Sequence, residues 1–196
     1  MSFVAKFFYL ACHKPKASSS YIMKAEKRRL KNHKEIINYM KQRINAMEKA
    51  QGALSAMFGL GKYLAKSSIE KSLQHLLEYR VSQINGCAYC LDMHSKDLRA
   101  AGETEQRLFV LDAWREAPFY TSRERAALAW AEAVTKLPDN QVSDEVYEEA
   151  RQEFSEQELI DLTMCVVTIN SWNRLNIAFR TEAGSYQPGQ WASVAN

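Results

Sequence analysis

The 196-residue chain has no apolar run long enough to cross a membrane, only seven glycines, and almost no net charge. A transmembrane helix needs about 20 predominantly apolar residues, so no membrane span is expected. The glycines form no phosphate-cradling loop, and we therefore expect no bound organic cofactor. A formal charge of +3 is too small to indicate a nucleic-acid partner. What remains is an ordinary globular composition with 46% apolar residues.

Cysteine is also scarce. Four cysteines in a chain of this length do not form the disulfide framework of a small secreted protein. The opening segment 3–12 resembles a signal peptide only weakly, since it lacks a basic start and Lys6 interrupts its apolar stretch. We therefore expect a cytoplasmic protein, in which a CxxC pair indicates redox or metal chemistry. Cys165 lies in an apolar run and is expected to be inert core.

Three regions follow from the distribution of residues along the chain. Residues 1–40 are expected to be a leader, either disordered or absent from the native protein if translation starts at Met40. The basic stretch 24–41 within and just beyond it is expected to be a solvated face rather than a nucleic-acid arm. Residues 41–183 form the domain. Residues 184–196 contain glycine and proline and are expected to be a loose or partner-bound tail.

From Met47 onwards the apolar spacing is helical and no segment alternates like a strand. The pattern predicts helices over 53–64, from a cap at Ser68, from the CxxC motif to Gly102, and from Thr104. Capping boxes at Thr121 and Ser155 open two more, the second running over about 156–181, and Ser143 starts the helix between them. The predicted fold class is an all-α bundle. Arg80, beside apolar stretches, is expected to form an ion pair with Glu132 or Asp161.

The chemistry concentrates in Cys87, Cys90 and His94, which follow each other at i, i+3 and i+7. On a helix these offsets fall on one face. Asn85-Gly86 is a turn and N-cap signal, so the helix is expected to begin at Cys87. Free backbone N–H groups at a helix start favour a thiolate. The motif therefore predicts redox thiol chemistry.

Residues 43–180 resemble the alkylhydroperoxidase D-like (AhpD-like) branch of the carboxymuconolactone decarboxylase family. Several blocks carry the resemblance in order: RVSQINGCAYCLDMHSKD (80–97), GETEQRL (102–108), AWREAP (113–118), RAALAWAE (125–132) and INSWNR (169–174). The resemblance implies an all-α fold, homo-oligomers that are commonly trimers or hexamers, and a thiol-dependent peroxidase. Carried over by position, Cys90 is the peroxidatic thiol, Cys87 the resolving thiol and His94 a member of a proton relay.

Two positions depart from the peroxidase pattern of that family. Its relay carboxylate lies twelve residues before the first cysteine, where this chain has His75. Glu78 lies one helical turn later and shares a face with that position, so either His75 or Glu78 could orient His94. Tyr89 also stands between the cysteines, where the founding peroxidase has a histidine.

Peroxide reduction needs both a thiolate and a proton donor. Lowering the thiol pKa alone gains only a few-fold in rate, because nucleophilicity falls as the pKa falls. The departing alkoxide needs a proton, which His94 at i+4 from Cys90 is placed to deliver. The sulfenic acid would then close with Cys87 to a disulfide. The resemblance implies a hydroperoxide substrate and a dihydrolipoyl or thioredoxin-like electron donor.

Two other functions stay open from the sequence. One is lactone decarboxylation, the second chemistry of the family, although that branch does not rely on a CxxC. The other is a non-catalytic redox sensor or zinc module, with Cys87, Cys90, His75 and His94 as metal ligands. The CxxC spacing suits zinc, but a third ligand on the same rigid helix makes tetrahedral closure awkward, and we expect no metal.

Overall fold

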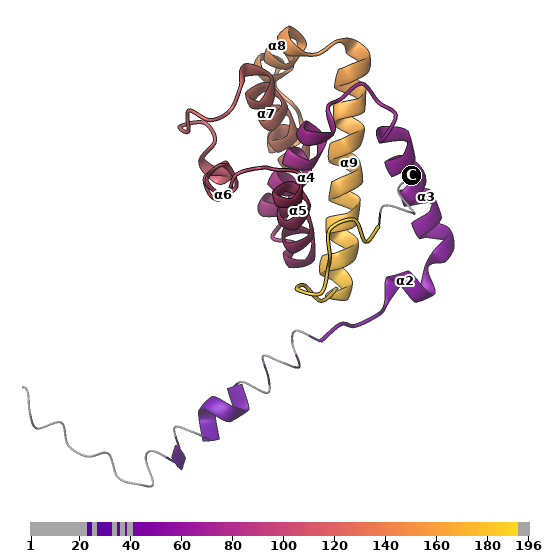
Figure 1. The fold of residues 1–196 in the computed structure, drawn as a ribbon, viewed down its shortest axis with the longest axis vertical. Coiled ribbons are helices and arrows are strands. Elements are labelled where there is room, and N and C mark those ends of the chain that lie inside the picture. Colours follow the sequence, from indigo (N-terminus) through magenta and orange to yellow (C-terminus); the bar gives the residue numbers. More distant parts are fainter. Residues whose placement is uncertain (1–22, 25–26, 33–34, 36–37, 39–40, 192–196) are drawn as a thin grey trace, which may run out of the picture. The chain divides into compact units, whose positions relative to one another are not determined.

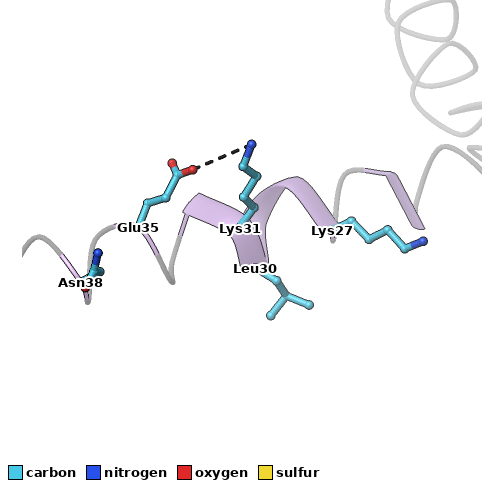
Figure 2. Close-up of a pocket in the computed structure, with 5 residues that line it drawn as sticks. All are labelled: Lys27, Leu30, Lys31, Glu35 and Asn38. Atoms are coloured by element: carbon cyan, nitrogen blue, oxygen red, sulfur yellow. Dashed lines mark ion pairs between the residues drawn. The ribbon is translucent and has the colours of Figure 1, made fainter.

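The computed structural model describes residues 23–24, 27–32, 35, 38 and 41–191, and the chain divides into the units Met1–Lys41 and Gln42–Asn196. In the first unit, residues 27–32 are helical and exposed. Five side chains border a surface hollow there (Figure 2), namely Lys27, Leu30, Lys31, Glu35 and Asn38. A single exposed helical stretch cannot enclose a ligand, so we place no site in it. Most of the predicted leader, including Met40, lies outside the described residues.

The described part of the second unit is built from helices joined by loops, followed by a non-helical tail. They are α2 (Ala46–Lys49), α3 (Gln51–Leu64), α4 (Lys71–Asn85), α5 (Ala88–Ala100), α6 (Glu105–Phe109), η1 (Leu111–Ala113), α7 (Ser122–Lys136), η2 (Pro138–Asn140), α8 (Asp144–Glu153) and α9 (Glu156–Phe179). Nothing in the described part of the chain is a strand, and the predicted all-α fold is confirmed. Among the described residues, no helix has both the length and the apolar character needed to cross a bilayer.

The long helix α9 lies at the centre of this unit (Figure 1), with α3 on one side and α4 and α5 on the other. It also contacts α7 and α8. The core between α4, α7 and α9 is formed by side chains with no measurable exposure, among them Leu77, Val81, Leu128, Leu162 and Val166. Their helical spacing within each segment directs one apolar stripe of each helix inward. This packing fixes α4 and α5 side by side, and both carry the predicted site residues.

The helix starts confirm most of the capping signals and correct two of them. Thr104 and Ser143 cap α6 and α8, and both capping boxes are formed, at Thr121 and Ser155. The predicted cap at Ser68 is wrong, because α4 begins at Lys71 after Glu70. The preceding loop is closed locally instead, where the Ser67 hydroxyl donates to the Leu64 carbonyl at 2.8 Å.

The Asn85-Gly86 pair ends one helix rather than capping the next. Asn85 is the last residue of α4, and Gly86 adopts the left-handed conformation (φ 69°) that terminates it. A glycine suits this position because it has no Cβ to clash at positive φ. Cys87 itself is the N-cap of α5, and Gly102 follows that helix with φ 95°. The predicted limits of the CxxC helix are therefore confirmed within two residues.

Arg80 is buried and pairs with Glu132, as predicted. Its Nε and Nη2 atoms donate to Glu132 Oε1 at 2.9 and 2.8 Å. Trp114 Nε1 donates to the same oxygen at 2.9 Å, and Arg115 donates to Oε2 at 2.8 Å. Burial opposes ionisation of Glu132, but these donors outweigh it and lower its pKa to about 2. Arg80 also forms an ion pair with Asp112, and we call Arg80, Asp112, Trp114, Arg115 and Glu132 the Arg80–Glu132 network.

The C-terminal tail contacts α5 as far as Trp191, so this stretch is not the loose end that was one of the two predicted alternatives; the partner-bound alternative stays a prediction. Tyr186 is buried, and its hydroxyl donates to Asp97 at 2.9 Å. Lys96 Nζ donates to the carbonyls of Gly184 and Tyr186, at 3.2 and 3.1 Å. Trp191 Nε1 donates to the Tyr89 hydroxyl at 3.1 Å. Residues 192–196 lie outside the described part.

Candidate active site

Both motif cysteines lie at the first turn of α5, which follows directly after the end of α4. Cys87 has extended backbone angles as the N-cap, and the Cys90 N–H donates to its sulfur at 3.4 Å. The two sulfurs are joined in a disulfide, with 5.4 Å between the Cα atoms. Each cysteine is only 1% exposed. The pair is therefore a buried helix-start dithiol couple in its oxidised form.

Asn176 on α9 contacts this couple, and the sequence-based reasoning missed it. Its Nδ2 donates to the Cys90 sulfur at 3.4 Å. Asn170 and Asn173, on the same face of α9, each accept a 2.9 Å hydrogen bond from Asn85 Nδ2. Asparagines at i, i+3 and i+6 on one face of α9 are the sequence signal that could have revealed this contact. This column of asparagines ties α9 to Asn85, which precedes the disulfide, and to Cys90 within it.

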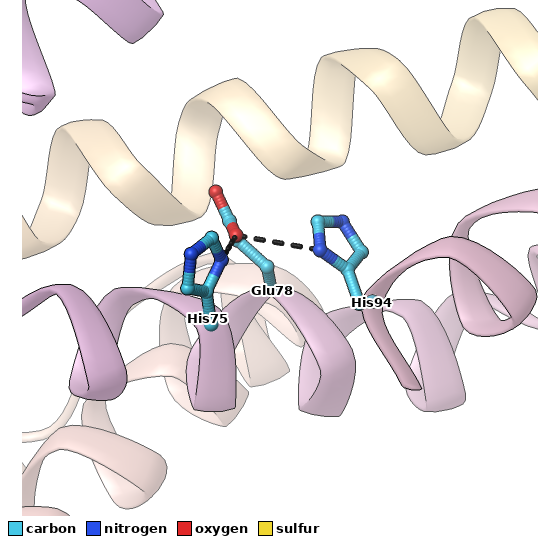
Figure 3. Close-up of side chains that lie close together, drawn as sticks. All are labelled: His75, Glu78 and His94. Atoms are coloured by element: carbon cyan, nitrogen blue, oxygen red, sulfur yellow. Dashed lines mark hydrogen bonds and ion pairs between the residues drawn. The ribbon is translucent and has the colours of Figure 1, made fainter. Parts of the chain in front are cut away.

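His75, Glu78 and His94 meet between α4 and α5, and we call them the imidazole–carboxylate cluster. Figure 3 shows the Glu78 carboxylate between the two rings, with His75 and Glu78 one turn apart on α4 and His94 on α5. Glu78 Oε2 lies 3.0 Å from His75 Nδ1 and 3.4 Å from His94 Nδ1. The sequence left open whether His75 or Glu78 lies beside His94. The structure brings both into the cluster, and Glu78 contacts both imidazoles.

The surroundings shift the pKa values of the two histidines in opposite directions. Burial disfavours charge on His75, but the hydrogen bond and the charge of Glu78 outweigh it, so its pKa is raised. Burial dominates at His94, whose pKa is lowered although Glu78 acts against this. Burial also resists ionisation of Glu78, yet both histidines hold its pKa below the ordinary value. At neutral pH the cluster therefore pairs a carboxylate with a neutral His94.

His94 is the one member whose polar atoms are not satisfied. It is 5% exposed, and neither Nδ1 nor Nε2 makes a hydrogen bond within the described part of the chain. The 3.4 Å approach to Glu78 is therefore an electrostatic contact without hydrogen-bond alignment. Buried polar groups are usually hydrogen-bonded, and exceptions often mark functional sites. His94 lies one helical turn after Cys90, so a free imidazole borders the redox couple.

The third described cysteine takes no part in this site. Cys165 on α9 is buried, and its sulfur makes only a long 4.0 Å contact with the Gln74 carbonyl. Burial, together with the negative charge of Glu78, raises its pKa well above the ordinary value. A thiol held in the neutral form is a poor nucleophile. This agrees with the prediction of an inert core residue.

A family model, a relative in sequence and a solved structure all match this chain. The model of the carboxymuconolactone decarboxylase family matches residues 51–133. The uncharacterized protein YdfG of Bacillus subtilis (strain 168) is 43% identical over 146 residues, which are 74% of this chain and 99% of YdfG. The crystal structure of a protein of unknown function from Agrobacterium tumefaciens, named as a candidate antioxidant defence protein AhpD, is 39% identical. It aligns with a TM-score of 0.71 over 74% of this chain and all of its own.

An enzyme also has this fold. The apo structure of the debrominase Bmp8 is 25% identical and aligns with a TM-score of 0.63, over 71% of this chain and 75% of its own.

Proposed function

This chain belongs to the carboxymuconolactone decarboxylase family, in its AhpD-like branch, and we propose that it is a thiol-dependent hydroperoxidase. The observation that carries the proposal is the buried Cys87–Cys90 couple at a helix start, with the unsatisfied His94 one turn beyond it. The couple supplies two electrons, and the imidazole supplies a proton-transfer group beside it.

In the first step, the neutral His94 takes the proton of the Cys90 thiol, directly or through water. The lowered pKa of His94 means that it has a free lone pair at neutral pH. The Asn176 amide donates to the Cys90 sulfur, and such a hydrogen bond stabilises the thiolate over the thiol. We therefore assign Cys90 as the attacking residue.

In the second step, the thiolate attacks the terminal oxygen of the hydroperoxide and the O–O bond breaks. Cys90 becomes a sulfenic acid, and the departing alkoxide leaves as an alcohol with the proton returned by His94. While His94 carries that proton, its positive charge is balanced by the Glu78 carboxylate 3.4 Å away. His75, hydrogen-bonded to the same oxygen, holds Glu78 in place.

In the third step, the Cys87 thiol attacks the sulfenic sulfur, which releases water and forms the disulfide. The two residues are three positions apart at the start of one helix, so the resolving thiol lies one turn from the sulfenic acid. A dihydrolipoyl or thioredoxin-like protein would return the pair to the dithiol. We place this cycle in the cytoplasm, where such donors keep thiols reduced, and in a homo-oligomer such as a trimer or hexamer.

The test is hydroperoxide consumption by the full chain with dihydrolipoamide or reduced thioredoxin as donor. Cys90→Ser should abolish turnover. Cys87→Ser should still consume one hydroperoxide per chain and then stop. Cys165→Ala, which removes a buried thiol outside the site, is the matched control and should turn over normally. If Cys90→Ser retains normal turnover, the attacking thiol is misassigned; if the wild type consumes lactone but no hydroperoxide, the alternative family chemistry is correct.

A further inference from the structure

We propose that His75, Glu78 and His94 form a binding site for a divalent transition-metal ion, for which Zn²⁺ is the best match. The first observation is the donor set itself. One ligand atom from each residue, two imidazole nitrogens and one carboxylate oxygen, lies within 4.8 Å of the other two. The second is that both His94 nitrogens are buried without a hydrogen-bond partner.

The spacing of the donors fits a small tetrahedral ion. Ligand bonds of about 2.0–2.1 Å put neighbouring donor atoms of a tetrahedron about 3.3–3.4 Å apart. Glu78 Oε2 lies 3.0 Å from His75 Nδ1 and 3.4 Å from His94 Nδ1. The third pair of donors, on His75 and His94, lies within 4.8 Å, so binding of one ion by all three requires these two rings to rotate toward each other. Two histidines and one glutamate also leave a fourth position for water, as in zinc sites with three protein ligands.

The donor chemistry selects the class of metal. Imidazole nitrogens suit Zn²⁺ and neighbouring transition metals, whereas Ca²⁺ and Mg²⁺ prefer oxygen ligands. One carboxylate and two neutral imidazoles carry a charge of −1, which a divalent ion reverses to +1. Glu78 keeps part of its side chain exposed, 22%, so the ion has a route to water. His75 is similarly exposed, at 25%.

This ligand set differs from the one that the sequence left open. That set used both cysteines with His75 and His94, but the sulfurs are bonded to each other here and offer no thiolate. The structure instead brings the carboxylate of Glu78 between the two rings (Figure 3). With the disulfide formed, a metal on this cluster is therefore held without sulfur ligands.

Metal binding and proton transfer need the same lone pairs. An ion held by His94 and Glu78 occupies the atoms that would accept and balance the proton from Cys90. If the proposed peroxidase function is correct, Zn²⁺ is accordingly an inhibitor of it, and a chelator restores activity. This consequence rests on the proposed function, whereas the binding site itself does not.

The binding experiment uses the full chain with the disulfide intact, so that Cys87 and Cys90 cannot ligate. Zn²⁺ is titrated against a chromogenic chelator, and Co²⁺ is added separately to record its visible absorption. We expect one ion per chain and a Co²⁺ spectrum typical of nitrogen and oxygen ligands without sulfur. His75→Gln and Glu78→Gln should each weaken Zn²⁺ binding at least about 10-fold, since even residues outside the ligand shell change metal affinity by about 10- to 100-fold.

The double variant His13→Gln/His33→Gln is the matched control, because it removes the other two histidines of the chain and should leave affinity unchanged. His94 is buried, and its replacement risks the fold, so the partly exposed His75 and Glu78 carry the test. Absence of stoichiometric binding, full affinity in both cluster variants, or a sulfur-ligand Co²⁺ spectrum would each overturn the proposal. Absence of peroxidase activity with these binding results intact would contradict only the proposed function.

Discussion

Two clusters of ionisable side chains that include residues of α4 differ in how many of their polar atoms are hydrogen-bonded. In the Arg80–Glu132 network, one buried carboxylate receives hydrogen bonds from Arg80, Trp114 and Arg115. In the imidazole–carboxylate cluster, the carboxylate contacts two histidines, and the ring of His94 makes no hydrogen bond with any part of the chain that the structure describes. Both regions contain groups with shifted pKa values. A shifted pKa alone therefore does not distinguish a structural network from a site.

The two clusters differ in whether they can exchange a proton near neutral pH. Glu132 is held ionised, with its pKa at about 2, and every donor around it is already used. It has no proton to exchange near neutral pH. His94 is neutral at that pH and has a free nitrogen lone pair, one helical turn after Cys90 of the redox couple. Satisfied polar groups stabilise the fold, and an unsatisfied one retains the capacity to react or to bind.

The largest expected effect comes from breaking the Arg80–Glu132 network. Arg80→Met leaves Glu132 buried without its main partner, and loss of one member of a buried ion pair costs about 3–5 kcal/mol of unfolding free energy. Urea denaturation measures this. The double variant Arg80→Met/Glu132→Leu should recover much of the loss, because no buried charge remains unpaired. Equal stability of Arg80→Met and wild type would mean that the network contributes little.

Glu78→Gln should show the opposite profile, a large loss of activity with a small change in stability. Removing a group that supports general acid–base catalysis typically costs about 10²- to 10⁴-fold in rate. Glu78 is partly exposed, so its neutral replacement should change the unfolding free energy by about 1 kcal/mol or less. Hydroperoxide turnover and urea denaturation are measured together. Glu70→Gln, at an exposed ion pair with Arg123, is the control and should retain activity.

Asn176→Leu should raise the pKa of the Cys90 thiol, because it removes the N–H donor from the sulfur. A hydrogen bond to a charged group contributes about 1.5–3 kcal/mol, which corresponds to about one to two pKa units. The rate of iodoacetamide alkylation against pH, in the Cys87→Ser background, reports this value. Asn170→Leu changes the same column but not the sulfur contact, and its alkylation profile should match the parent.

The sequence predicted the fold well because the signals that it used are local. Capping boxes at Thr121 and Ser155 and the glycine after α5 depend on neighbouring residues, and the structure has them where predicted. Ser68 is the exception: serine is a preferred N-cap residue, yet α4 begins after Glu70, which makes no side-chain capping hydrogen bond, so the local signal did not decide this helix start.

The site was predictable only in part. Cys87, Cys90 and His94 share one helix, so their spacing alone places them on one face. Asn176 comes from α9, 86 residues after Cys90, and only tertiary packing brings it to the sulfur. The position of Glu78 between two imidazoles likewise depends on how α4 and α5 pack, which spacing alone leaves undetermined.

The smallest expected effect is a difference in how stability depends on pH. Burial lowers the pKa of His94 below its ordinary value of 6.5, so the unfolded chain binds this proton more readily than the folded one. His94 therefore costs stability as the pH falls through about 6.5 and below, by at most about 1.4 kcal/mol per pH unit. His75, with its raised pKa, acts in the opposite sense, since its stabilising contribution is present at low pH and lost as the pH rises.

Comparing wild type with a His94→Gln variant that retains its far-UV circular dichroism measures the pH dependence that the imidazole adds, including its interaction with Glu78. The glutamine variant lacks the titrating group, so the unfolding free energy of the wild type relative to the variant should be larger at pH 8 than at pH 5.5. The same comparison for Glu132→Gln should show no change over this range, because a carboxylate with a pKa of about 2 does not titrate there. A constant difference for His94→Gln would mean that the imidazole is solvated in the folded state, and the contrast between the two regions would then disappear.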